Sequence, residues 1–405
     1  MNLQRLLQAA VQYGASDVHL KPGRAPIIRI NGELHELTKH PRLSPPDIIA
    51  SAELMMDDRQ VALFKEQNEI DLAYSLPGLG RFRVNIFRQR GSIAVALRII
   101  PYQIRTFAEL HMPPVLEKIA ADQRGMVVVT GATGSGKSTT LASMIDYINS
   151  NRTCHIITVE DPIEFLIRDK KSAISQREVG IDTKGFLTAL RAALRQDPDV
   201  ILVGEMRDLE TMTTALQAAE TGHFVLSTLH TTDVMETISR ILAVFPPGQE
   251  NQVRFQLSTS LKAIICQRLV PRADGSGRVP AVEVLVSNAR VQECIKEPKK
   301  TSEIPDIMTQ SYTTYGMQSF DMSLMQLVRD KLITVEAALQ NATNPGDFKL
   351  RLQGVSGADE ARFDEYSEGV EKKKKGPGGG GTGGGGGAGG QKGGNFGDLI
   401  ERFSE

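Results

Sequence analysis

Apolar positions in the first hundred residues switch between the periods of helices and strands. Residues 3–13 carry apolar side chains on one face, which predicts a helix. Short apolar or alternating runs bounded by turn residues then predict strands at 16–20, 26–30, 33–37, 70–75, 80–87 and 93–100. A single helix is predicted over residues 45–64. Together these elements predict a small α+β domain with an antiparallel sheet over residues 1–100.

A different pattern begins near residue 115. Almost wholly apolar runs alternate with helical segments, which predicts a parallel sheet covered by helices. These runs lie at 126–130, 154–159, 173–176, 200–203 and 224–228. Strands are also predicted at 268–271 and 278–285, and helices at about 289–296, 303–310, 318–330 and 334–341. The predicted fold class is therefore α/β, with this second domain over residues 115–353.

Two stretches lack these periods. Residues 101–114 contain three prolines, and we interpret them as a linker or hinge between the domains. Residues 354–394 are charged and then almost entirely glycine, which predicts a flexible, disordered tether. The last segment, 395–405, is either a frayed tail or a short amphipathic docking helix. Its apolar residues at helical spacing are Phe396, Leu399, Ile400 and Phe403.

The composition narrows the functional classes. A formal net charge of −1 argues against a nucleic-acid coat protein and against a binder of anionic membranes by bulk charge. The three cysteines are widely spaced, which excludes a disulfide framework and a cysteine-rich zinc site and fits a reducing cytoplasm. No apolar run approaches the roughly 18 residues that a membrane-spanning helix needs. We therefore expect a cytoplasmic protein whose contact with a membrane is through a partner only.

The clearest chemical signal is the segment GATGSGKS at residues 131–138. It matches G-x-x-x-x-G-K-[ST] at every fixed position, directly after an apolar strand and before a helix. In this pattern glycines let consecutive N–H groups turn toward an anion, and the helix N-terminus adds a partial positive charge. Lys137 is expected to reach the β- and γ-phosphates of ATP, and the Ser138 hydroxyl to bind Mg²⁺. The nucleotide-binding candidates are Gly131, Thr133, Gly134, Ser135, Gly136, Lys137, Ser138 and Thr139.

Acidic residues follow two of the predicted strands, at the sheet edge where ligands of such sheets bind. Glu160, Asp161 and Glu164 come after the strand at 154–159. After the strand at 200–203, a glycine stands where P-loop enzymes carry a Mg²⁺-binding aspartate. The next residue, Glu205, is therefore our candidate to polarise the attacking water. Mg²⁺ would depend on the phosphate-loop serine, on water molecules and on Glu160 or Asp161, while Glu160 and Glu164 are further catalytic candidates. The alternative for each carboxylate is a helix cap or a salt bridge.

Polar residues also end the strand at 224–228. Thr228 and His230 can hydrogen-bond a γ-phosphate and sense its loss, so His230 is a catalytic candidate. His223 precedes the same strand and is a further candidate for contact with the nucleotide. The alternative for each histidine is a structural role in the core.

The last two strands of the first domain are rich in arginine. Either these side chains cover a solvated sheet face, or some of them reach a nucleotide held by a neighbouring subunit. A guanidinium in that place would stabilise charge on the γ-phosphate. The residues concerned are Arg81, Arg83, Arg88, Arg90 and Arg98.

These segments resemble, in the same order, the Walker A, Asp, Walker B and His boxes of the secretion-superfamily ATPases. The four boxes lie at 131–138, 158–164, 199–208 and 221–231. Within that superfamily the chain is similar to the type IV pilus retraction ATPases, the PilT family, over about residues 1–353. Four further segments carry this resemblance: ASDVHLKPGRAPIIRINGEL at 15–34, GRFRVNIFRQRG at 80–91, SQREVGIDT at 175–183 and YGMQSFDMSL at 315–324.

The resemblance implies a PAS-like N-terminal domain, a RecA-like ATPase domain and a homohexameric ring. ATP would lie between the two domains, with arginines, most of all Arg83 and Arg98, closing over it. The ring would work at the cytoplasmic face of a bacterial inner membrane, on the pilus platform protein (PilC-like). There it would hydrolyse ATP to drive pilin disassembly, pilus retraction and twitching motility. A second retraction ATPase is a candidate partner.

One departure from the family keeps an alternative open. Its retraction members carry an AIRNLIRE-like helix, and the corresponding stretch here has Gln292 and Lys296 in place of the two arginines. An accessory, PilU-like retraction ATPase or a divergent paralogue is therefore an alternative. The extension motors and type II secretion ATPases carry a longer N-terminal region and usually a tetracysteine zinc element, and this chain shows neither.

Two other classes of function fit the sequence less well. A RecA-like nucleic-acid translocase would need a basic channel or stacking aromatic residues, whereas this chain is near neutral, has 5% aromatic residues and has no tryptophan. We therefore expect no nucleic-acid partner. A nucleotide-gated scaffold without hydrolysis would lack a catalytic acid, but Glu160 and Glu205 are both present.

Overall fold

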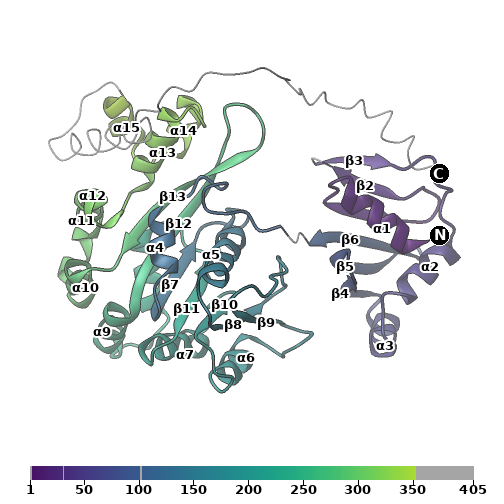
Figure 1. Ribbon diagram of the computed structural model, residues 1–405, viewed down its shortest axis with the longest axis horizontal. Helices are drawn as coiled ribbons and strands as arrows, with labels where there is room; N and C mark the ends of the chain where they lie inside the picture. Colours follow the sequence, from purple (N-terminus) through teal and green to yellow (C-terminus); the bar gives the residue numbers. More distant parts are fainter. Residues whose placement is uncertain (1, 31, 101–102, 353–405) are drawn as a thin grey trace, which may run out of the picture. The chain divides into compact units, whose positions relative to one another are not determined.

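The computed structural model describes residues 2–30, 32–100 and 103–352, and these form two compact units (Figure 1). Unit 1 contains the described residues up to 100, and unit 2 contains residues 103–352. The tether at 354–394 and the amphipathic segment at 395–405 lie outside the described residues. Within the described ranges, no helix is long and apolar enough to cross a membrane.

Unit 1 is a six-stranded antiparallel sheet with helices on one face. The strand order is β3-β2-β1-β6-β5-β4. Leu7, Ile48 and Phe64, one from each helix, share a core with the inward side chains of the strands. The elements are α1 (Leu3–Gln12), β1 (Asp17–Leu20), β2 (Ile27–Ile30), β3 (Glu33–Glu36), α2 (Pro45–Glu53), α3 (Asp58–Gln67), β4 (Glu69–Leu76), β5 (Gly80–Gln89) and β6 (Ser92–Ile100).

The single helix predicted over 45–64 is wrong, because the chain forms two helices there. Asp57 starts the second one with a capping box: its carboxylate accepts from the backbone N–H of Gln60, whose side chain accepts from the backbone N–H of Asp57. Such a reciprocal cap satisfies two donors that an uninterrupted helix would satisfy internally. The residues on either side favour helix, so the apolar pattern continues across the break.

Unit 2 is built on a seven-stranded sheet in the order β13-β12-β7-β11-β10-β8-β9. All neighbouring pairs are parallel except β12 and β13, which form an antiparallel hairpin. The strands are β7 (Gly125–Thr130), β8 (His155–Glu160), β9 (Ala173–Glu178), β10 (Val200–Val203), β11 (Phe224–Leu229), β12 (Leu261–Pro271) and β13 (Arg278–Val286). This architecture is the predicted α/β class.

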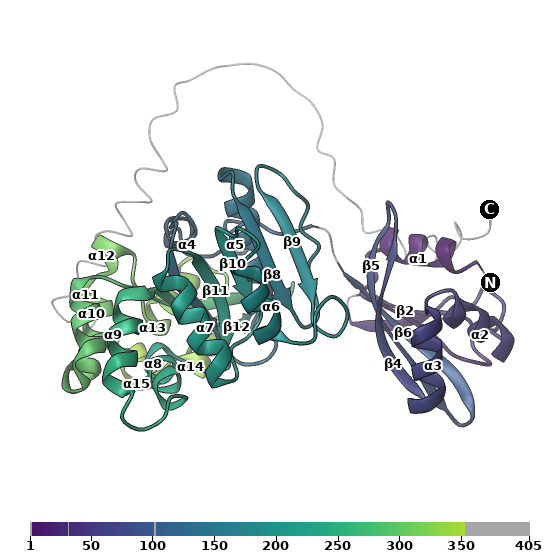
Figure 2. The ribbon, with the colours of Figure 1, turned by 90° about the horizontal axis from the view of Figure 1, so that it is seen from below.

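Helices cover both faces of this sheet (Figures 1 and 2). One face packs against α4 (Val115–Ala120) and α5 (Lys137–Asn151). The other face packs against α6 (Phe186–Ala193), α7 (Leu209–Glu220), α8 (Val234–Ala243) and α9 (Glu250–Ser260), and the same core extends into the C-terminal helices. The C-terminal elements, of which η1 and α12 contain no buried residue, are α10 (Ala289–Lys296), η1 (Pro298–Glu303), α11 (Ile304–Gln310), α12 (Tyr312–Tyr315), α13 (Phe320–Arg329), α14 (Val335–Asn341) and α15 (Pro345–Leu352).

Two segments of unit 2 differ from the prediction. β12 begins at Leu261, although the sequence predicts a strand only from residue 268. It follows α9 directly, so no turn residue marks the change of period. In the segment before α4, Phe107 and Met112 are buried in the core beside α5, so this part of the predicted linker packs on unit 2.

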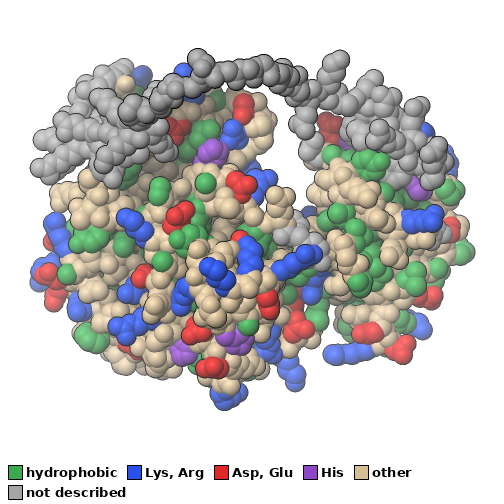
Figure 3. All heavy atoms as spheres, in the orientation of Figure 1, with side chains coloured by type: hydrophobic (Ala, Val, Ile, Leu, Met, Phe, Trp, Pro, Cys, Tyr) green, Lys and Arg blue, Asp and Glu red, His purple; other side chains and the backbone are tan. Residues whose placement is uncertain are grey.

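Charged side chains of both signs lie on the face of unit 2 that Figure 3 shows. Basic and acidic side chains are interspersed there, without a broad field of one sign.

A largely buried carboxyl group links β13 to α8. One oxygen of Glu283 accepts a hydrogen bond of 2.9 Å from the backbone N–H of Val234, the first residue of α8. Burial raises the pKa of Glu283 to about 7, and the nearby Asp233 carboxylate adds to this effect. The hydrogen bond from the backbone N–H of Val234 and the guanidinium of Arg268 act in the opposite direction.

We expect Glu283→Gln to remove a pH-dependent loss of stability. The pKa of Glu283 in the folded chain, about 7, lies above the ordinary value of 4.5. Between these values the unfolded chain releases the proton and the folded chain keeps it, so stability falls as pH rises through this window. The loss is fully present above pH 7 and amounts to roughly 3 kcal/mol at most. The amide oxygen of glutamine can still accept from the N–H of Val234.

Urea unfolding at several pH values between 4.5 and 8 measures this effect as the difference between the two proteins. That difference should grow in favour of the variant as pH rises. Glu117→Gln, at an exposed position in α4, is the matched control and should follow the wild type. Parallel pH profiles for Glu283→Gln and the wild type would contradict the prediction.

Candidate active site

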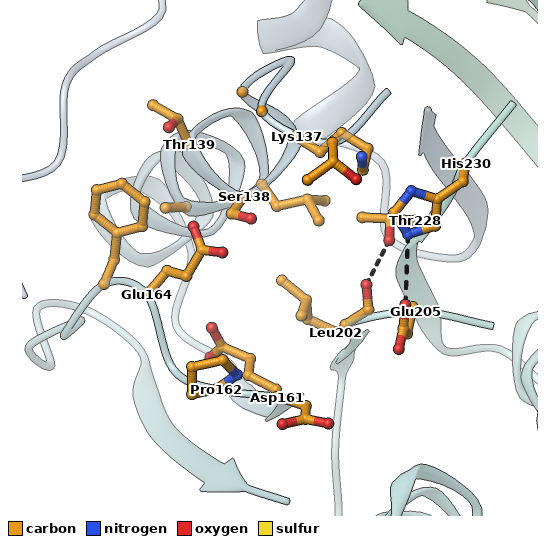
Figure 4. A pocket seen from close by; sticks show the side chains of 18 of the residues that line it. Lys137, Ser138, Thr139, Asp161, Pro162, Glu164, Leu202, Glu205, Thr228 and His230 are labelled. Carbon is orange, nitrogen blue, oxygen red and sulfur yellow. Dashed lines mark hydrogen bonds and ion pairs between the residues drawn. The ribbon is translucent and has the colours of Figure 1, made fainter. Parts of the chain in front are cut away.

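A cavity of about 590 Å³ lies where β7, β8, β10 and β11 end. The sheet is parallel here, so residues that follow each strand meet at one edge. Figure 4 shows that Ser138, Glu164, Glu205 and His230 surround the same space. The cavity is lined by Thr133, Gly134, Gly136, Lys137, Ser138, Thr139, Leu141, Ala142, Glu160, Asp161, Pro162, Glu164, Phe165, Ile167, Phe186, Leu202, Gly204, Glu205, Arg207, Thr228, His230, Leu269 and Arg278.

The phosphate loop turns the chain from β7 into α5. Gly134 and Gly136 have φ angles of 78° and 93°, in the left-handed region that favours glycine. A Cβ at Gly131 would lie 2.4 Å from the carbonyl oxygen of Gln267, and one at Gly136 would lie 2.7 Å from its side-chain nitrogen. The glycines are therefore required by backbone conformation and by close packing on β12. Gly131 and Ser135 form the buried back of the loop, behind the residues that line the cavity.

Lys137 is half-buried and folds back onto its own loop. Its ammonium group donates to the carbonyl oxygens of Gly131 at 2.7 Å and Ala132 at 3.1 Å. Burial lowers the pKa of Lys137, while the carboxylates of Glu164 and Glu205 act in the opposite direction. A cation held by carbonyl oxygens at the mouth of a glycine-rich loop suits an anionic ligand, which offers it stronger partners.

The carboxyl group of Glu160 is held in place from two sides. It accepts hydrogen bonds from the hydroxyl of Thr158 at 2.6 Å and from the side-chain nitrogen of Gln176 at 3.0 Å. Burial raises the pKa of Glu160. Gln176 also donates to the carbonyl oxygen of Phe165 and accepts from the backbone N–H of Ile167. One glutamine on β9 therefore fixes both Glu160 and the segment that follows it.

Glu205 lies across the cavity from the phosphate loop. One of its carboxylate oxygens is 2.7 Å from Nε of Arg207 and 3.6 Å from Nε2 of His230. Figure 4 draws the second contact as a dashed line. The Thr228 hydroxyl donates to the carbonyl oxygen of Gly204 at 2.6 Å, which ties the end of β11 to the end of β10. The two strand ends that carry Glu205 and His230 are thus joined directly.

Three other predicted residues are not among those that line the cavity. His223 precedes β11, at the edge of the sheet opposite the phosphate loop, and its Nδ1 contacts the carbonyl oxygen of Ala218 at 2.9 Å. The structure does not bring it to this cavity. Arg83 and Arg98 are in unit 1, where they face each other across β5 and β6. Arg98 also forms an ion pair with Asp17, at 2.9 Å.

Several residues that line or support the cavity were not identified from the sequence, among them the four that follow. Arg207 stands two positions after Glu205, within the box at residues 199–208 that the sequence analysis identifies. Its closeness to Glu205 in sequence was therefore a signal that could have predicted its place in the cavity. Leu269 and Arg278 reach the cavity from the β12–β13 hairpin, and Gln176 supports it from β9. Their places depend on strand order, which spacing along the chain does not reveal.

Comparison with known proteins shows that most of the chain is similar to secretion and pilus ATPases. The family model described as type II/IV secretion system protein matches residues 1–340. The type IV pilus retraction ATPase PilT of Pseudomonas aeruginosa is 44% identical over 348 residues, covering 86% of this chain and 100% of that protein. The type IV pilus ATPase PilU of the same organism is 41% identical over 370 residues, covering 91% and 96%. A crystal structure of the pilus retraction motor PilT with bound ADP is similar with a TM-score of 0.78 and 46% identity, covering 86% and 98% of the two chains.

The likeness therefore reaches well beyond the phosphate loop. It covers both units and nearly the whole length of each relative. The RecA-like class predicted for the second domain is confirmed by the similarity to the PilT structure. The chain belongs to the type II/IV secretion system protein family, among the ATPases related to the type IV pilus retraction ATPase PilT.

Proposed function

We propose that this chain is a motor ATPase that hydrolyses ATP to power retraction of type IV pili. The observation that carries the proposal is one cavity with a complete phosphate loop on one side and Glu205 on the other. Such a cavity can hold a nucleoside triphosphate with a carboxylate near its terminal phosphate. The relatives matched over nearly their full length include PilT, and a PilT structure holds ADP.

The phosphate loop supplies the binding site. The backbone N–H groups of residues 133–138 and the first turn of α5 bind the phosphates, with Thr139 at the end of this group. Lys137 exchanges the carbonyl oxygens of Gly131 and Ala132 for the β- and γ-phosphate oxygens. Because the loop is already turned and the lysine already lies at its mouth, little rearrangement is needed on binding.

The residues present also fit Mg²⁺ bound together with the nucleotide. Among the described residues no group of three or more His, Cys, Asp or Glu side chains could hold a metal alone. This fits an ion that keeps several waters and shares its ligands with substrate phosphates. Ser138 would hold it, with Glu164 or Asp161 facing its water shell across the cavity. When bound, Mg²⁺ neutralises charge on the β- and γ-phosphate oxygens.

Glu205 is the proposed base that orients and polarises the attacking water. Arg207 and His230 contact the same carboxylate oxygen and so orient it toward the cavity. Through this contact His230 also senses whether the γ-phosphate is present. Thr228 holds the end of β11, just before His230, in place. Glu160, braced by Gln176, positions the segment that carries Glu164.

We further propose a homohexamer in which a PAS-like unit 1 acts on the nucleotide of a neighbouring subunit. Arg83 and Arg98 form a basic pair across two strands, on the sheet face opposite the core of unit 1. Arg98 would leave Asp17 and stabilise charge on the γ-phosphate, with Arg83 beside it. Opening and closing about the part of the predicted linker that precedes Phe107 would then convert hydrolysis into motion.

The proposed partner is the pilus platform protein at the cytoplasmic face of the inner membrane, alone or with a second retraction ATPase. The similarity to PilU and the residues Gln292 and Lys296 in α10 favour an accessory retraction ATPase as the second candidate. The two candidates share the chemistry of the cavity. They differ in whether retraction fails when this chain alone is removed.

Glu205→Gln should abolish hydrolysis and leave nucleotide binding intact. The amide keeps the size of the side chain but cannot accept a proton, so turnover should fall by about 100-fold or more. Phosphate release by the purified full chain measures turnover, and titration with a fluorescent ATP analogue measures binding. Glu210→Gln, at a glutamate with 65% of its side chain exposed, is the control and should behave as the wild type. Undiminished turnover in Glu205→Gln would exclude this residue as the base.

Removal of the gene should increase surface pili and stop twitching, because extension would continue without retraction. Glu205→Gln expressed in its place should give the same phenotype. Counts of surface pili and the width of twitching zones in the parent organism test this. Normal twitching in the deletion strain, beside an active purified enzyme, would favour the accessory role. Loss of pili altogether would contradict retraction and indicate an assembly motor.

A further inference from the structure

Gln267 lies in β12, the strand beside β7, and contacts the phosphate loop at its start and at its end. Its side chain is buried, with 3% of its surface exposed. It lies behind the loop, outside the residues that line the cavity. The residue is 132 positions from the loop in sequence, so no motif links the two.

Both ends of the Gln267 amide are hydrogen-bonded to the loop and to the helix that follows it. The nitrogen donates to the carbonyl oxygen of Ser135 at 2.8 Å, and the oxygen accepts from the hydroxyl of Thr140 at 2.8 Å. Thr140 is fully buried in the first turn of α5. A side chain bonded at both ends in a buried place holds a single orientation.

The loop also fits closely against this residue. A Cβ at Gly131 would lie 2.4 Å from the backbone oxygen of Gln267, and one at Gly136 would lie 2.7 Å from its side-chain nitrogen. The start, the end and the helical continuation of the loop are thus all in contact with one residue.

The Ser135 hydrogen bond has a consequence for the neighbouring amide. In a trans peptide the C=O of one residue and the N–H of the next point in opposite directions. The carbonyl of Ser135 points back toward Gln267, so the N–H of Gly136 points away from it. Gly136 lines the cavity, and Gln267 and Ser135 do not. The bond to Gln267 therefore turns the Gly136 N–H toward the place of the phosphates.

We propose that Gln267 is a positioning residue that sets the phosphate loop in its binding conformation before the nucleotide arrives. The inference rests on the proposed nucleotide binding and deepens it. Without the two side-chain hydrogen bonds of Gln267, which we call the brace, the Ser135–Gly136 peptide can rotate. Only a fraction of molecules then presents the Gly136 N–H to the ligand. The apparent dissociation constant rises by the inverse of that fraction. The rate at saturating ATP changes much less, because Glu205 and His230 stand on other strands.

Gln267→Met is the main test, since methionine keeps the length of the side chain and removes both hydrogen bonds. The dissociation constant for a fluorescent ATP analogue and the KM for ATP should rise about 10-fold, with kcat within about 3-fold of wild type. Hydrogen exchange of peptides covering residues 131–137 should be faster in the unliganded variant. Ser258→Ala removes a buried hydroxyl in α9, which leads into β12 at the strand end opposite the loop, and is the matched control with wild-type affinity.

A second pair of variants tests the brace from its other end. Thr140→Val removes the hydroxyl that holds the Gln267 amide and should weaken binding, whereas Thr140→Ser restores the hydroxyl and should restore most of the affinity. The double variant Gln267→Met, Thr140→Val should bind less weakly than the product of the two single effects predicts, because both remove the same bond. This pair also decides the question if Gln267→Met does not fold.

Wild-type affinity and kinetics in a folded Gln267→Met would overturn the inference, and so would equal affinities for Thr140→Val and Thr140→Ser. Lys137→Ala separates this failure from failure of the proposed function. If that variant loses nucleotide and Gln267→Met does not, only the brace is refuted. If the wild-type chain binds no ATP analogue at all, both proposals fall.

Discussion

The close approach of the phosphate loop to β12 is the constraint on which the site depends. The chain must pass from a buried strand to a helix within six residues and leave backbone N–H groups facing outward. In this chain the loop does so while packed against the next strand, where Gln267 occupies the space that side chains at Gly131 and Gly136 would fill. The glycines of the motif are thus required for close packing on β12 as well as for the backbone conformation of the loop.

The parallel sheet then brings the remaining groups to the same edge. β8, β10 and β11 all end beside the loop, so residues that follow them in sequence become neighbours in space. The Thr228 hydroxyl joins two of these ends through the carbonyl of Gly204, and Gln176 braces the third. Short hydrogen-bonded links therefore join the strand ends that form the cavity, and they hold its side chains rigidly on the sheet.

The sequence allowed the parts with a strong local signal to be predicted. The phosphate loop, the strand-end carboxylates and most elements follow from period and motif. The helix break at Asp57 was missed because a capping box interrupts a pattern that remains helical on both sides. The start of β12 was missed because it follows α9 without a turn. Gln267 and Gln176 could not be found, since their partners are set by strand order.

The two acidic candidates differ in the contacts that hold them, and this difference favours different roles within the proposed mechanism. The carboxyl group of Glu160 accepts from Thr158 and Gln176, both on strands of the sheet, and burial raises its pKa. Such a group is fixed and disfavours the charged form. Glu205 instead contacts Arg207 and His230, whose side chains are 73% and 49% exposed. Exposed partners are freer to move than strand residues, so the proposed cycle requires less rearrangement if Glu205 changes its contacts than if Glu160 does. This favours Glu205 as the group that meets the attacking water and Glu160 as part of the frame around it.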